Sequence, residues 1–293
     1  MRATTSALNP LSALLSAILL LVASPAAWAD TPPAKKTTDP AARSQVIDEI
    51  LDLSGVKKAL ESVPGQIEEE MANPDGEYGK LPDAQREQLH QIMLDAFSPE
   101  RLIGGMKQTL VENYRQPLYE AVRARLNSPQ GRRLTELEAQ LTVADIQERL
   151  LAYGEELAKA PAKPERMKLI AALDKTALTS ETILDLSVAT FAAVALAARE
   201  EAAPLDEKAL QKSLAGIRAR LRPAIASQTA LMLLYVHRDV SDRDLQGFIR
   251  FYQDKNMTVM SGIVRKGFGR AMNDGYREML KRARNIRGDA VRT

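Results

Sequence analysis

A chain of 293 residues without a single cysteine has no disulfides, no thiolate metal ligands and no cysteine nucleophile. Apolar residues make up 45% of the sequence and aromatic residues only 4%, so aliphatic side chains must fill the core. This balance favours packed helices over sheets, because strands draw on β-branched and aromatic residues. The formal net charge of +2 argues against nucleic acid as a partner.

The N-terminus has the order of features found in a secretory signal peptide. Arg2 supplies a positive charge, an apolar run extends from Leu11 to Ala23, and Ala27-Trp28-Ala29 fits the small-x-small pattern that signal peptidase needs. The apolar run is shorter than the ~20 residues that cross a bilayer. An uncleaved anchor is the alternative. We therefore expect residues 1–29 to be removed and the protein to be periplasmic.

The next segment, residues 30–43, contains three prolines and a lysine pair without apolar periodicity, which is typical of a disordered tether. From Ser44 onward, apolar residues recur at three- and four-residue spacing and predict a helix that ends near Val63-Pro64-Gly65. Ser98-Pro99-Glu100 then predicts a helix start with a cap, a first-turn proline and an acid. We place the first helical module at residues 44–160.

Two further starts are predicted in this module, at Ser128-Pro129 and at Thr142, which has Asp145 three residues later as a short capping box. Pro161 and Pro164 then interrupt the helical pattern and mark the module boundary.

The second module, residues 165–288, contains two segments that are apolar on almost every side, 182–199 and 223–236. Such segments predict buried central helices. Ser241 caps the next helix, which reaches Phe251-Tyr252, and a final helix runs from about Met257 to Ala283. The ends of the two modules align when the sequence is shifted by 126 positions. A shift of 123 positions places Ile47 on Ile170 and Ile50 on Leu173. The prediction is an all-α helical bundle built from two similar helical modules.

Charge is divided unevenly along the chain. Residues 44–100 carry thirteen acidic and four basic side chains, whereas residues 264–293 carry nine basic and three acidic ones. The simpler interpretation is that these two ends pack together, or pair across a homodimer. The alternative is that the basic end meets an anionic surface or an envelope protein.

The final helix is predicted to be amphipathic, with one apolar side from Val264 to Ile286. A basic amphipathic helix can lie on an anionic membrane or bind a partner. In the simpler interpretation, the apolar side closes the core and the charges face water. The candidate interaction surface consists of Arg270, Arg277, Lys281, Arg282, Arg284 and Arg287.

Both modules end in a pattern of a helix, a short turn and a second helix with a basic start. The first module has Ser128, Pro129 and Gly131 in its turn, and the second has Phe251-Tyr252 at the end of its first helix. On these residues the chain resembles the family called domain of unknown function 2059.

Each copy also departs from the family pattern. The first has Arg125-Leu126 in place of Phe-Tyr, and the second has Asp254, Lys255 and Met257 in place of Ser, Pro and Gly. The resemblance implies an exported, all-helical protein in which the aromatics anchor one helix and Ser-Pro starts the next. It implies no catalytic residue.

Catalytic patterns are weak throughout. The two histidines, His90 and His237, lie in different modules without metal-ligand spacing, and His237 has the ordinary interpretation of a cation near a helix end. Ser54 and Lys57 match a Ser-x-x-Lys pattern without its partner motifs. The acids of Glu68-Glu69-Glu70 point in different directions and predict a solvated face. We therefore predict no catalytic, cofactor-binding or metal-binding residue and no cofactor.

These features favour a non-enzymatic periplasmic helical protein that binds another cell-envelope component, most simply a protein. One alternative is a binder of an apolar small molecule or lipid in a cavity between the two apolar helices around Phe191 and Leu233. The other alternative is a cell-wall-modifying enzyme, which would need convergent carboxylates.

The signal peptide yields the first prediction. Mature protein from the periplasmic fraction should begin at Asp30, because cleavage follows Ala29. N-terminal sequencing or intact mass spectrometry measures this directly. An intact N-terminus recovered in the membrane pellet would contradict it.

Overall fold

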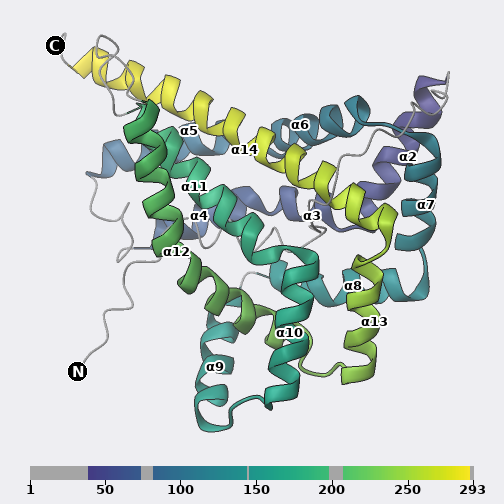
Figure 1. Cartoon of the computed structure of the whole chain (residues 1–293). Coiled ribbons are helices and arrows are strands. Elements are labelled where there is room, and N and C mark those ends of the chain that lie inside the picture. The colour runs from purple at the N-terminus through teal and green to yellow at the C-terminus, as the bar shows by residue number, and fades with distance from the viewer. Residues whose placement is uncertain (1–38, 74–81, 144, 198–206, 291–293) are drawn as a thin grey trace.

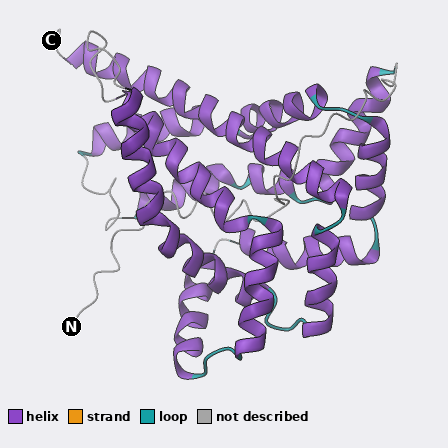
Figure 2. Cartoon of the chain, viewed as in Figure 1, coloured by secondary structure: helices purple, strands orange, loops and turns teal. Residues whose placement is uncertain are grey.

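The structure is a computed structural model that describes residues 39–73, 82–143, 145–197 and 207–290. The predicted signal peptide, with Ala27 and Ala29, lies outside these residues, as does the tether up to position 38. Over the described ranges the chain is helix and loop without a strand, as Figure 2 shows. The predicted all-α helical bundle is confirmed.

The order of the elements follows the chain, and Figure 1 labels most of them. They are α2 (Pro40–Leu53), α3 (Val56–Glu61), α4 (Val63–Ala72), α5 (Asp83–Ala96), α6 (Pro99–Glu112), α7 (Gln116–Leu126), α8 (Pro129–Glu138), the 3-10 helix η2 (Ala139–Thr142), α9 (Ile146–Lys159), α10 (Pro164–Ala177), α11 (Thr179–Ala197), α12 (Glu207–Val236), α13 (Asp242–Tyr252) and α14 (Lys255–Ala290).

Several predicted helix starts are confirmed. The hydroxyl of Ser128 accepts a hydrogen bond from the Gly131 amide at 3.2 Å, and that of Ser241 accepts one from the Asp244 amide at 3.1 Å. These bonds satisfy amides that have no partner inside the helix. Ser98 also precedes a helix that begins with proline, although its side chain makes no capping bond.

Three predicted boundaries are wrong. Helix α2 begins at Pro40, inside the predicted tether, because Asp39 caps it by accepting from the Ala41 amide at 2.9 Å. Val63 starts α4 where an end was predicted, since proline is tolerated in the first turn of a helix. Thr142 closes η2, and α9 starts after Asp145.

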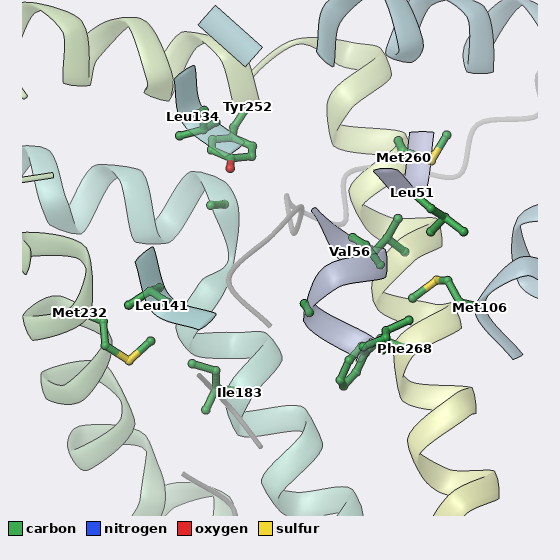
Figure 3. Close-up of a cluster of buried hydrophobic side chains, with 14 of the residues drawn as sticks. Leu51, Val56, Met106, Leu134, Leu141, Ile183, Met232, Tyr252, Met260 and Phe268 are labelled. Atoms are coloured by element: carbon green, nitrogen blue, oxygen red, sulfur yellow. The ribbon is translucent and has the colours of Figure 1, made fainter. Parts of the chain in front are cut away.

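Helix α14 crosses the molecule and packs against α5, α6, α7 and α11 (Figure 1). Its apolar side is buried: Val264, Phe268, Met272 and Tyr276 are each less than a tenth exposed. Figure 3 shows Phe268 and Met260 of α14 together with Met106 of α6 and side chains of the first helices. This side of α14 therefore closes the core, which is the simpler of the two interpretations.

Helices α11 and α12 also pack against each other. Ile183 of α11 and Met232 of α12 are buried, as predicted for central helices (Figure 3). Phe191, however, is 38% exposed, because it lies further along α11, beyond the buried Ile183, Leu184 and Ser187. The prediction of a buried helix thus holds for the first part of α11 and fails at Phe191, and the side chains after Phe191 lie outside the described part of the structure. No helix among the described residues is long and apolar enough to cross a membrane.

The two predicted modules, residues 44–160 and 165–288 and called the two halves below, contain helices of matching length. Helices α2 and α10 each have 14 residues and begin with proline, and α7 and α13 each have 11. Helix α2 packs on α7 as α10 packs on α13. The aligned pairs Ile47 with Ile170 and Ile50 with Leu173 are all buried. A duplicated module stays a prediction that these correspondences support.

Contacts between the halves are reciprocal: α7 packs on α14, and α8 packs on α13. The Arg125 guanidinium lies 5.0 Å from the centroid of the Phe251 ring. These two residues are 126 positions apart, so they occupy the same place in the predicted repeat. Equivalent residues meet in this way across a two-fold axis.

Gly131 yields a prediction about this junction. A Cβ atom at this position would lie 2.3 Å from the Leu126 carbonyl oxygen and 2.7 Å from that of Arg125. Backbone atoms cannot rotate away, so Gly131→Ala should lower the free energy of unfolding by about 1–3 kcal/mol in urea denaturation.

Gly104 of α6 is the matched control, because nothing lies within 4 Å of a Cβ atom there. Gly104→Ala should raise stability by about 0.5–1 kcal/mol, since alanine loses less backbone entropy than glycine in a helix. Equal effects of the two substitutions would contradict the close packing at Gly131.

Candidate functional site

The basic residues of α14 form one row along the helix. At 3.6 residues per turn, positions 266, 270, 277, 281 and 284 fall within a sector of about 60°, opposite Phe268 and Met272. Lys266, Arg277 and Lys281 of this row are exposed. Among the described residues, none of these three has a carboxylate within ion-pair distance. We call these three side chains the basic face.

Two other predicted surface residues are used inside the fold. The Arg270 guanidinium contacts both oxygens of Glu112 on α6 at 2.9 Å. The Arg282 guanidinium contacts Asp95 of α5 at 2.5 Å and Glu278 at 2.8 Å. The pKa of Glu112 and that of Glu278 are lowered, first by these hydrogen bonds to arginine. Arg282 therefore joins the basic end of the chain to the acidic segment 44–100, whereas Arg270 joins it to Glu112, beyond that segment.

The surroundings of the basic face add one cation and three acids. Lys266 contributes to the lowered pKa of Glu112, and Lys281 to that of Glu278. Arg101 of α6 is exposed and contributes to the lowered pKa of Glu278, so it lies near the Lys281 end. Asp274 is exposed and lies beside the row on α14. Arg284 and Arg287 belong to the last turns of α14, and their side chains are outside the described part of the structure. The predicted surface is thus reduced to its exposed members.

The residues of the family-like pattern come together at a second place. Gly131 of α8 and Phe251 and Tyr252 of α13 line one small cavity, together with the buried carboxyl of Glu138. Ser128 and Pro129 start α8 beside it. One half thus contributes the Ser-Pro-Gly turn and the other the Phe-Tyr pair, which the sequence presents as two incomplete copies.

Glu138 was missed by sequence reasoning. Its side chain is only 5% exposed, and the Tyr252 hydroxyl donates to its Oε1 at 2.7 Å. Burial raises the pKa of Glu138 to about 8, and the bond from Tyr252 opposes this only in part. The pKa of Tyr252 is raised well above its usual value by burial and by the neighbouring carboxyl. The one signal for Glu138 was its place on the apolar side of α8, four residues after Leu134.

His237 corrects another expectation. It follows the end of α12, but it is fully buried, with Nδ1 donating to the Leu233 carbonyl at 2.9 Å and Phe248 against the ring. Burial lowers the pKa of His237 to about 4. A neutral imidazole therefore stands where a cation was predicted, because the cost of desolvating the charge exceeds the attraction of the helix end.

The Ser-x-x-Lys match has a structural role at both positions. The Ser54 hydroxyl is buried and donates to the Leu51 carbonyl, and the Lys57 ammonium pairs with Asp52 at 3.1 Å. In the described ranges, no group of three or more histidine or carboxylate side chains is placed to hold a metal ion. Around the expected apolar site, Leu233 is buried whereas Phe191 is exposed.

Comparison with known proteins found no match to a family model, a curated protein or a solved structure.

The buried histidine yields a prediction for acidic pH. Because the pKa of His237 is lowered from 6.5 to about 4, the folded state binds fewer protons than the unfolded state between these values. Its stabilisation is present above pH 6.5 and is lost as pH falls. The unfolding constant of the wild type relative to His237→Gln should rise about tenfold per pH unit on acidification through this range. Urea denaturation of both proteins at several pH values measures the ratio, and a constant ratio would refute the neutral buried imidazole.

Proposed function

We propose that this protein is a non-enzymatic, exported helical protein that binds an acidic surface of another cell-envelope protein. The observation that carries the proposal is that the two sides of α14 have different surroundings. Its apolar side is buried in the core, while Lys266, Arg277 and Lys281 remain exposed on the opposite side. The export signal, with its Ala27-Trp28-Ala29 site, supports the periplasm as the place of action.

These three charges contribute little to folding and are available to bind a partner. An exposed lysine or arginine contributes under about 1 kcal/mol to folding through a surface ion pair. The basic face has no such pair in the described structure, so the fold has little need of it. Carboxylates of a partner would gain charge-assisted hydrogen bonds there and would be attracted at long range.

The apolar-ligand alternative receives less support. The two residues expected to line its cavity have different surroundings, since Leu233 is buried in the core and Phe191 is exposed. The enzyme alternative would need carboxylates that converge on a substrate-sized cleft. Glu138 is a buried carboxyl with a raised pKa, but its cavity has room for little more than one water molecule.

Charge reversal tests the proposal. The triple variant Lys266→Glu, Arg277→Glu and Lys281→Glu should keep the wild-type unfolding curve to within about 1 kcal/mol, because exposed charges contribute little to stability. In affinity capture from envelope extract followed by mass spectrometry, it should lose the acidic proteins that the wild type retains. Added salt should release the same proteins from the wild type, since screening weakens contacts between exposed charges.

A matched control reverses three other exposed cations, Lys159, Lys168 and Arg220, and so changes the net charge equally. It should retain the wild-type partners. Co-sedimentation of the wild type with phosphatidylglycerol vesicles separates a lipid surface from a protein partner. Binding to such vesicles in place of proteins, or equal capture by both triple variants, would contradict the proposal.

A further inference from the structure

A small cavity lies at the junction of the two halves, and its only ionisable wall residues are Glu138 and Tyr252. The open volume for the centre of a water molecule is about 10 Å³. Cavities of this size hold one water molecule if two to four polar groups line them. The wall consists of Ser54, Leu126, Gly131, Leu134, Thr135, Glu138, Phe251 and Tyr252.

None of the hydrogen bonds around the cavity uses the proton of a neutral Glu138 carboxyl. The Tyr252 hydroxyl donates to Glu138 Oε1 at 2.7 Å, so its hydrogen is already used. The hydroxyls of Ser54 and Thr135 donate to the main-chain carbonyls of Leu51 and Leu53, at 3.3 Å and 2.8 Å. Their hydrogens are used too, while their oxygens can still accept. A neutral Glu138 therefore needs an acceptor for its own proton inside the cavity.

Few charges face Glu138 from the elements around it. Tyr252 is the titratable group contributed by α13, and α7 contributes Leu126 to the wall. The nearest cation on α7 is Arg125, whose guanidinium lies over the ring of Phe251, 5.0 Å from its centroid. Ser54, which follows α2, is neutral. An ionised Glu138 would thus have one hydrogen bond from Tyr252 and no ion pair in the described structure.

We propose that the cavity binds one water molecule, which accepts a hydrogen bond from the neutral carboxyl of Glu138 and donates one to Ser54 or Thr135. When Glu138 ionises, this hydrogen bond is lost and α8 loosens from α13. Neutral Glu138 then acts as a latch between α8 and α13, one of several pairs of helices through which the halves contact each other. Ionisation leaves a buried charge with two donors, the Tyr252 hydroxyl and this water molecule, and without an ion pair in the described structure, a state that is unfavourable unless more water enters. The junction relieves this cost by opening.

The direction of the pH dependence follows from the burial of Glu138. Its pKa is raised from 4.5 in the unfolded chain to about 8 in the folded protein. The folded state consequently holds an extra proton between these values, and stability is full below pH 4.5 and falls as pH rises towards 8. This is opposite in sign to the effect of His237.

Glu138→Gln tests the latch, since glutamine has the same shape, stays neutral and still donates to a water molecule. Urea denaturation of wild type and variant is measured at intervals from pH 5 to pH 9. The unfolding constant of the wild type relative to the variant should rise about tenfold per pH unit up to about pH 8. Taking the ratio cancels the contribution of His237. A ratio that does not change with pH would overturn the proposal.

Glu136→Gln is the matched control, because Glu136 lies on the same helix with 68% of its side chain exposed. Its ratio to the wild type should stay constant. If Glu138→Gln does not fold, the carboxyl carbon of Glu138 can be titrated by NMR in the wild type, and a midpoint near that of exposed glutamates would overturn the proposal. Amide hydrogen exchange, corrected for the chemical rate, should speed up in α8 and α13 between pH 6 and pH 9. Uniform protection in these helices would equally contradict the latch.

Discussion

Burial of the apolar side of α14 is the constraint on which the rest of the structure depends. Phe268, Met272 and Tyr276 must leave water, and the helices that cover them come mainly from the first half of the chain. Removing a buried aromatic side chain costs about 3–5 kcal/mol, whereas an exposed ion pair contributes under about 1 kcal/mol. The pairs of Arg270 with Glu112 and of Arg282 with Asp95 are therefore consequences of this packing. One pair, Arg282 with Asp95, joins the basic end to the acidic segment 44–100, while Lys266, Arg277 and Lys281 have no ion pair among the described residues.

The same packing leaves two polar features of different character. On the outside, the basic face is free because the opposite side of α14 is occupied. At the junction of the halves, Glu138 and Tyr252 are buried together where close approach of α7 and α8 already requires glycine at position 131. At the offset of 126 the corresponding residues are Val264 and Leu126, both buried and apolar. Of the two equivalent contacts between the copies of the predicted repeat, one is thus a hydrogen-bonded pair and the other is hydrocarbon, and a buried polar pair is stable only in the register that satisfies it.

Errors of the sequence-based predictions fall where local signals compete. Asp39-Pro40 is a valid helix start inside a proline-rich segment that otherwise indicates a tether. Val63-Pro64-Gly65 contains residues typical of a helix end, yet proline in the first turn begins α4. His237 follows a helix end, where a local argument predicts a cation, but tertiary burial makes it neutral. In each case a second interaction, invisible to the single pattern, decided the outcome.

The sequence by itself determined the all-helical class, the caps at Ser128 and Ser241, the amphipathic character of α14 and the absence of cysteine chemistry. These properties depend on residues within one or two turns of each other, so they can be read from spacing. Only the tertiary structure decided that Arg282 pairs with Asp95, and that Glu138 meets Tyr252 from 114 positions away. It also decided which cations of α14 stay exposed. Helix periodicity identifies which side of a helix is apolar, but it contains no information on which other helix will cover that side.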